Sequence, residues 1–429
     1  MHDADSIAAL AARWDQLDRE AYAIPHDRIA DREPLLIERL RVAASFGLDD
    51  PRLEKSHANL LHYYYCDVGR YDKAEVVCTY WIALKHDRLT ASPHDIHVLH
   101  EYGLTFSMAG RQAEAESQYR RALRLAEDTH GVDAPETFGP LYQLAQHLHN
   151  TKRPAEAVPL GERLFAMKRE GRVGRWDHPP GFLADDYRAL GRLADAEAIR
   201  REEYERRLRE RASDDTSDLG LRVHSLAPMA DLVAEQGRLD EAIDLMREAV
   251  ALAQTFYGQM VAQHESARRE AERRGMKTAG PLRRWYEMGL RASFGDLLRR
   301  AGHLDEAEAV YRELLVLQEA DQSLPPSALS FHPDRFGDET IARANSAALS
   351  AERRCEILRG LAAVLRDAGR ATEAMPLAAE ADRLAADAAS FRARVKRIGL
   401  KRAAREDRPD LVSVDDLRRL LATGHDTGV

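Results

Sequence analysis

The stretch Gly237-Arg238-Leu239-Asp240-Glu241-Ala242 decides the fold, because related copies of it recur along the 429-residue chain. The copies begin at residues 69, 110, 152, 191, 237, 302 and 369, and the first residue of each is here called its marker residue. The marker is Gly in every copy except the one at Lys152. Successive markers lie 41, 42, 39, 46, 65 and 67 residues apart. A recurring phrase at this spacing indicates an array of structural repeats.

The residues that flank each marker predict a helix–turn–helix unit. Seven residues before the marker stands a small residue in six copies, four before it stands a bulky residue, and five after it stands Ala. This spacing places a close-approach position and a bulky side chain on one face of a helix. Gly ends a helix well because it adopts the left-handed conformation at low cost. The small residues are Gly103, Ala145, Ala184, Ala230, Gly295 and Ala362; the bulky residues are Tyr65, Phe106, Leu148, Tyr187, Val233, Leu298 and Leu365; the alanines are Ala74, Ala115, Ala157, Ala196, Ala242, Ala307 and Ala374.

This pattern resembles the tetratricopeptide repeat (TPR), in the long form of about 42 residues found in kinesin light chains, over about residues 51–390. The resemblance implies an all-α fold, a right-handed α-solenoid of about seven TPR-like helix-turn-helix repeats with a helical N-terminal cap and two insertions. The chain departs from the family at Gly161, where an aromatic residue is usual, and at Arg200 and Glu203, which fall on a packing face.

We divide the chain into four segments. Residues 1–50 form an N-terminal helical cap, residues 51–212 hold repeats one to four, residues 213–390 hold repeats five to seven, and residues 391–429 form a basic C-terminal helical tail. The last two marker intervals exceed 42 residues, which predicts insertions at about 255–285 and 320–350. Proline residues in the second insertion, at 325, 326 and 333, exclude a continuous helix there.

Composition favours a cytoplasmic protein. The chain is 44% hydrophobic, has no run of about 18 apolar residues and lacks a signal-peptide pattern at its start, so we expect no membrane partner. Its three cysteines are too few for a disulfide framework and indicate a reducing compartment. A formal net charge of −9 opposes nonspecific nucleic-acid binding, although residues 268–284 and 392–408 are basic.

The common catalytic motifs are missing from the sequence. It contains no phosphate-binding loop, no Gly-x-Gly-x-x-Gly fingerprint, no Gly-x-Ser-x-Gly elbow and no His-Glu-x-x-His zinc helix. His94, His97 and His100 share one side of a helix and, with Glu101, could hold a divalent metal. We expect instead that His97 and His100 are groove residues, and we predict no catalysis, no cofactor and no bound metal.

The TPR resemblance implies that the first helix of each repeat lines a concave groove, with residues 13, 10, 6 and 3 before the marker pointing into it. The groove is then aromatic and histidine-rich in the first three repeats, acidic in the middle and arginine-bearing at the end. The candidate groove residues are Asn59, Tyr63, His97, His100, Tyr142, Gln146, His149, Asp185, Arg188, Asp231, Arg299 and Arg366. The same register also includes Cys66, Gly139, Ala227, Gly289, Ala292, Asp296, Glu356 and Arg359.

A groove of this kind suits an extended peptide or a helix. We therefore predict a non-catalytic interaction scaffold or adaptor with a protein or peptide partner in the concave groove. The alternative is a ligand- or peptide-sensing regulator that controls an effector. Two further interpretations have less support. One is a metal-dependent enzyme that uses His97, His100 and Glu101, and the other is a nucleic-acid binder.

Overall fold

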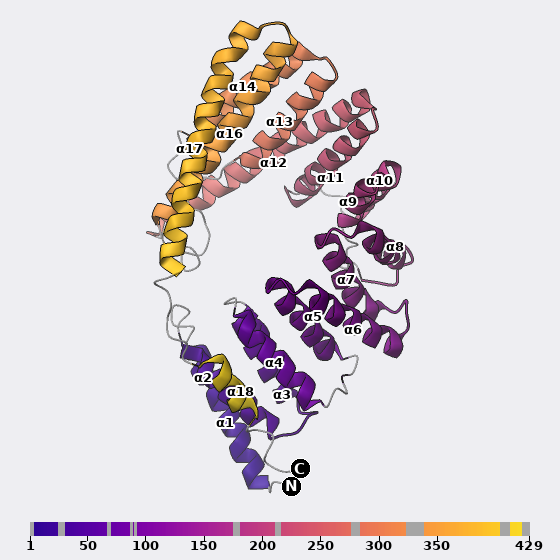
Figure 1. The fold of residues 1–429 in the computed structure, drawn as a ribbon, viewed down its shortest axis with the longest axis vertical. Coiled ribbons are helices and arrows are strands. Elements are labelled where there is room, and N and C mark those ends of the chain that lie inside the picture. The colour runs from indigo at the N-terminus through magenta and orange to yellow at the C-terminus, as the bar shows by residue number, and fades with distance from the viewer. Residues whose placement is uncertain are drawn as a thin grey trace. The chain divides into compact units, whose positions relative to one another are not determined.

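The computed structural model describes residues 4–24, 31–66, 70–85, 89, 92–174, 181–210, 216–275, 284–322, 339–403 and 412–422. Every regular element within these ranges is a helix, which confirms the all-α prediction (Figure 1). Among the described helices, none combines the length and the apolar character needed to cross a membrane. The chain divides into two compact units, unit 1 (Met1–Leu190 with Pro409–Val429) and unit 2 (Gly191–Arg408).

Unit 1 is built mainly from helices that pack on their neighbours in the sequence. The N-cap side chain of Asp50 accepts a hydrogen bond from the Arg52 amide, and that of Ser92 accepts one from the Asp95 amide, so two of its helices begin at capped positions. Its elements are α1 (Ala4–Ala23), α2 (Glu33–Ala44), α3 (Pro51–Leu60), the π-helix η2 (Leu61–Cys66), α4 (Tyr71–Leu84), α5 (Pro93–Met108), α6 (Gln112–His130), the 3₁₀ helix η3 (Pro135–Thr137), α7 (Phe138–Asn150), α8 (Pro154–Arg169), α9 (Phe182–Ala189) and α18 (Val414–Ala422).

Unit 2 contains the longest helices of the described chain. Its elements are α10 (Leu193–Glu210), α11 (Thr216–Glu235), α12 (Leu239–Arg273), α13 (Trp285–Arg300), α14 (Leu304–Gln322), α16 (Glu339–Asp367) and α17 (Ala371–Ala403). The first predicted insertion, about 255–285, begins as a continuation of the 35-residue α12. Residues 323–338 of the second insertion, with its prolines, lie outside the described residues, and the rest of it is the start of α16.

The marker residues end helices in the left-handed conformation, as predicted. Gly110, Gly237, Gly302 and Gly369 have φ values between 77° and 84°. Lys152, the non-glycine marker, has a φ of 61°. Gly191 has a φ of 72° and begins unit 2, while the marker at 69 lies outside the described residues. A side chain with a Cβ atom is strained in this region, so Lys152 is held there by the surrounding structure.

Close helix packing depends on the small residues that the repeat pattern singled out. A Cβ atom on Gly103 would lie 2.7 Å from Cε1 of Tyr119, and one on Gly295 would lie 2.7 Å from Cε2 of Tyr311. The alanines five residues after the markers are all buried. The departure at Gly161 also has a packing reason, because a Cβ atom there would lie 2.8 Å from Cδ1 of Leu183 on α9.

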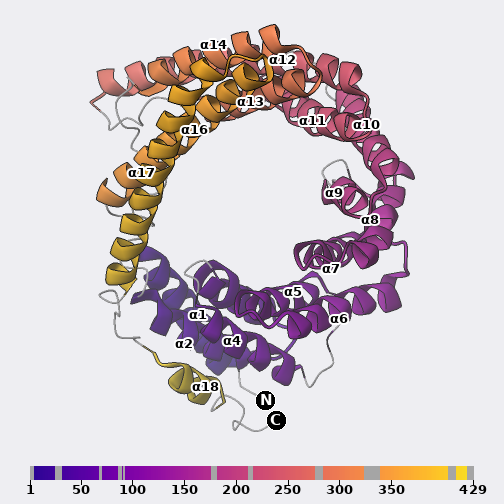
Figure 2. The ribbon, with the colours of Figure 1, turned by 45° about the horizontal axis from the view of Figure 1, so that its top comes forward.

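The C-terminal helix α18 packs in unit 1 against α4 and α2 (Figure 2). Val412, Leu417 and Leu421 are buried in the same apolar core as residues of α1 to α4. The predicted basic tail, 391–429, thus has two parts in the structure, since residues 391–403 continue α17. The boundary between the compact units, at Leu190 and Gly191, does not coincide with a boundary of the predicted segments 1–50, 51–212 and 213–390. Those segments remain a prediction from the sequence.

Candidate functional site

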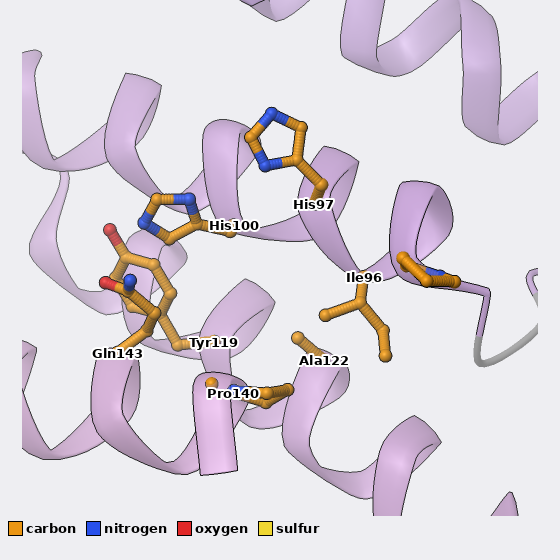
Figure 3. Close-up of a pocket in the computed structure, with 9 residues that line it drawn as sticks. Ile96, His97, His100, Tyr119, Ala122, Pro140 and Gln143 are labelled. Carbon is orange, nitrogen blue, oxygen red and sulfur yellow. The ribbon is translucent and has the colours of Figure 1, made fainter. Parts of the chain in front are cut away.

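A hollow of about 210 Å³ opens between α5 and α7 over α6 in unit 1 (Figure 3). The sequence prediction placed His97, His100 and Gly139 in the groove, and all three line this hollow. Its remaining lining residues are Pro93, Ile96, Tyr119, Ala122, Pro140 and Gln143. We call it the unit 1 hollow. Its mainly apolar wall with a few imidazole, phenol and amide groups can hold one side chain of a partner.

A buried carboxylate lies beside the imidazoles of this hollow. Glu101 is 2% exposed, and its Oε1 lies 3.4 Å from Nδ1 of His100 and 3.8 Å from Nε2 of His97. The thiol of Cys66, at the end of η2, donates a hydrogen bond of 3.2 Å to Oε2 of Glu101. Although burial raises the pKa of Glu101, hydrogen bonds from His100 and Cys66 and the nearby imidazoles outweigh it and lower this pKa to about 2.

His94 does not join this cluster, although its spacing along α5 suggested that it would. Its side chain is 5% exposed and packs edge-on against the rings of Trp81 and His57, with centroid separations of 4.5 and 5.2 Å. Burial lowers the pKa of His94 to about 4, so its imidazole is neutral in the folded protein at neutral pH. His94 is a core residue, and the three-histidine arrangement is not formed.

Unit 2 has a larger hollow of about 690 Å³, which we call the unit 2 hollow. Both charged and aromatic side chains line this hollow. Nη1 of Arg353 lies 3.0 Å from Oε2 of Glu356 on α16, and the hydroxyl of Tyr311 donates a hydrogen bond of 3.1 Å to the Ala292 carbonyl. Its lining residues are Ala227, Trp285, Tyr286, Gly289, Leu290, Ala292, Ser293, Asp296, Tyr311, Arg353 and Glu356. Five of them, Ala227, Gly289, Ala292, Asp296 and Glu356, are groove positions of the predicted register.

The two hollows occupy the same position in their repeats. Each contains the tyrosine that stands four residues after the packing alanine, Tyr119 in unit 1 and Tyr311 in unit 2. In both repeats that tyrosine packs over a glycine seven residues before the marker, Gly103 or Gly295. Burial raises the pKa of both phenols, to about 12 for Tyr119, so they remain neutral hydrogen-bonding groups.

Solved structures resemble the chain at low sequence identity. TPR-like repeats of a kinesin light chain from Podosopora anserina are 21% identical, cover 48% of this chain and 99% of that one, and give a TM-score of 0.41. The apo form of the quorum sensor NprR from B. thuringiensis is 13% identical and covers 88% of this chain and 99% of that one, with a TM-score of 0.39. A Rap protein complexed with competence and sporulation factor is 12% identical and covers 92% and 99%, with a TM-score of 0.36. No protein-family model and no curated protein matches the chain.

The fold is TPR-like. Its helical hairpins turn at left-handed marker residues, and buried small residues let the helices approach closely, as the TPR resemblance implied.

Three further candidates of the TPR register lie in unit 1 but away from the hollow. The half-buried rings of Tyr142 and His149 both contact Phe182 of α9, with centroid separations of 5.9 and 4.9 Å. His149 also places Nδ1 2.8 Å from Oδ1 of Asp186. Gln146, between them on α7, is half-buried. The predicted N-terminal groove residues therefore form two groups in the structure, one at the unit 1 hollow and one around Phe182.

Asn59 is covered by the N-terminal cap. Its side chain is 7% exposed, and Nδ2 donates a hydrogen bond of 3.0 Å to the hydroxyl of Tyr22 on α1. The side chain of Tyr63 lies outside the described residues. Asp185 and Arg188 are exposed on α9.

The candidates of unit 2 are exposed or engaged within the chain. Asp231 is exposed on α11, and Arg366 is exposed on α16, where its Nε donates to the Ala362 carbonyl. Arg299 is half-buried and forms an ion pair of 2.8 Å with Asp367. Because the Arg299 guanidinium is already paired with Asp367, it would bind an acidic group of a partner less strongly than an unpaired arginine would.

The sequence reasoning missed Tyr119, Gln143, Trp285, Tyr286 and Arg353 as lining residues. The groove register counted only the positions 13, 10, 6 and 3 before each marker, so it left out Tyr119 on a second helix and the other four residues, which lie at other positions of first helices. A signal for the hollows exists in the sequence, because Gly stands seven residues before the marker and Tyr nine after it only in the repeats at 110 and 302.

Proposed function

We propose that the chain is a non-catalytic binding module in which the unit 1 hollow and the unit 2 hollow each hold an extended peptide segment of a protein partner. The observation that carries this proposal is the equivalence of the two hollows. Both lie over a Gly–Tyr pair at the same repeat position, and both are lined by predicted groove residues.

The chemistry of each hollow suits peptide side chains. Apolar wall atoms bury part of a peptide side chain. The imidazole, phenol and amide groups of the unit 1 hollow, and the phenol, carboxylate and guanidinium groups of the unit 2 hollow, form hydrogen bonds with the peptide. Tyr and Arg are also residue types that contribute strongly to binding at protein interfaces. The unit 2 hollow, with Asp296, Arg353 and Glu356 at its wall, suits a charged side chain.

The test fills each hollow with a bulky side chain. A Cβ atom on Gly139, which lines the unit 1 hollow, would meet nothing within 4 Å, so Gly139→Phe occupies the hollow without a clash at its Cβ. Ser293→Phe does the same from an exposed position of the unit 2 hollow. Gly258 on α12 is exposed and also open around its Cβ position, which makes Gly258→Phe the matched control.

A random peptide library displayed on phage is selected on the wild-type protein, and enriched peptides are measured by fluorescence anisotropy. We expect Gly139→Phe or Ser293→Phe to raise the Kd of an enriched peptide at least about tenfold, which corresponds to about 1.4 kcal/mol. Gly258→Phe should leave the Kd unchanged. The proposal is wrong if no peptide is enriched, or if neither filled hollow weakens binding more than the control does.

A further inference from the structure

Three side chains at the mouth of the unit 1 hollow bring metal-ligating atoms together. One Nδ1 or Nε2 atom from each of His97 and His100 and one carboxylate oxygen of Glu101 all lie within 4.8 Å of one another. Residues at i, i+3 and i+4 share one face of a helix, so a single element, α5, supplies all three groups. Figure 3 shows the two imidazoles beside each other above Tyr119 and Gln143.

We propose that His97, His100 and Glu101 bind a zinc ion. Zinc bonds of about 2.0–2.1 Å to imidazole nitrogen and carboxylate oxygen place tetrahedral ligand atoms about 3.4 Å apart. The separations of Oε1 of Glu101 from Nδ1 of His100 and Nε2 of His97 are 3.4 and 3.8 Å. The first separation matches the tetrahedral spacing and the second is slightly longer.

Burial of the Glu101 carboxylate distinguishes this site from a cluster of exposed surface side chains. Glu101 is almost fully buried, whereas His97 and His100 are partly exposed, so the ion would sit between a fixed inner ligand and two outer ones. The thiol of Cys66 donates to Oε2, the second oxygen of Glu101, and so orients Oε1 toward the histidines. A hydrogen-bonded outer partner of this kind is typical of metal-ligating carboxylates.

The surroundings leave one coordination position open. Two imidazoles and one carboxylate complete three of four tetrahedral positions, and His97 and His100 line the unit 1 hollow. A water molecule or a carboxylate of a bound molecule in the hollow can take the fourth position. The η2 π-helix, which ends at Cys66, also brings the thiol toward α5, and π-helical turns are frequent at functional sites.

This inference changes the sequence-based expectation that the histidines bind no metal. The predicted ligand set included His94, which the structure buries against Trp81 and His57. The ligand set that the structure brings together has the buried carboxylate of Glu101 in place of His94, and the thiol of Cys66 hydrogen-bonds to this carboxylate. Zinc binding does not rest on the proposed peptide function, because metal titration needs no peptide.

The test is a titration of the chelator-treated full chain with Zn²⁺ by calorimetry and with Co²⁺ by visible absorption. We expect one equivalent of tightly bound metal and a tetrahedral cobalt spectrum without a sulfur charge-transfer band. His97→Ala and His100→Ala, at partly exposed positions, should each weaken binding at least about 100-fold, since loss of an outer-shell partner already costs about 10–100-fold. Cys66→Ala should weaken binding by about 10–100-fold.

The control is His130→Ala, which removes an exposed histidine at the end of α6 and should leave binding unchanged. Circular dichroism checks that each variant keeps its helices. Failure of the wild-type protein to bind one equivalent of zinc overturns the proposal. Equal binding by the wild type, His97→Ala and His100→Ala also overturns it, because the metal would then sit elsewhere.

Discussion

Replacement of Lys73 by Met should destabilise the junction between the N-terminal cap and the first hairpin. Nζ of Lys73 on α4 lies 2.6 Å from Oε1 of Glu33 on α2, and the two side chains are only 1% and 4% exposed. The hydroxyl of Tyr65 donates a hydrogen bond of 2.9 Å to the same oxygen. Loss of the ammonium group leaves a buried carboxylate with no cation beside it at this position, which costs about 3–5 kcal/mol.

An exposed ion pair in the same unit gives the matched control. Arg111 contacts Glu75 at 3.1 Å and Glu114 at 2.8 Å, but the side chains of Arg111 and Glu75 are 42% and 33% exposed. Water already solvates these charges, so Arg111→Met should change the stability of the unit little. The double variant Lys73→Met/Glu33→Gln should regain most of the loss, because it removes the uncompensated charge and keeps an acceptor for Tyr65.

The assay is hydrogen exchange of the amides of α2, η2 and α4, combined with urea unfolding followed by circular dichroism. Exchange is needed because repeat proteins unfold in parts and a single unfolding free energy then loses its meaning. We expect faster exchange in these elements for Lys73→Met, little change for Arg111→Met and recovery in the double variant. If Lys73→Met lowers the free energy of opening of these elements by less than about 1 kcal/mol, water reaches the Glu33 carboxylate and the reasoning is refuted.

Three further predictions follow from the turns, the core and the C-terminal helix. Lys152→Gly should raise the stability of unit 1 by about 1 kcal/mol in thermal unfolding, since Gly adopts the left-handed conformation without the cost that Lys bears, and a lower Tm would contradict this. Burial lowers the pKa of His94 to about 4, below its unfolded value of about 6.5, so the unfolded chain binds the proton first as pH falls and stability is lost between these values. This loss should reach about 2 to 3 kcal/mol by pH 4.5 in urea unfolding, and His94→Phe should remove it; an unchanged pH dependence in the variant would contradict the assignment. Leu417→Asp should release α18 and speed hydrogen exchange over residues 412–422 without affecting α7 and α8, whereas continued protection of α18 would mean that its buried leucines do not hold it.

The sequence by itself determined the repeat, the hairpins and their turns. Each of these depends on residues close together in the chain. They are the Gly that ends the first helix, the Ala through which the second helix packs against the first, and the bulky residue four positions before the turn. Helix periodicity relates such positions directly, which is why Ala115 and Gly110 behave as predicted. It also put His97 and His100 on one face of α5.

Only the tertiary structure decided which of these side chains meet. His94 shares the spacing of His97 and His100, yet contacts with Trp81 of α4 and His57 of α3 draw it into the core. Glu101 meets the thiol of Cys66 across 35 residues of sequence. The burial of α18 in unit 1 likewise depends on residues more than 300 positions away in α4. Such contacts follow from how separate helices pack, and the pattern of a single helix specifies which face is apolar but not which distant element will cover it.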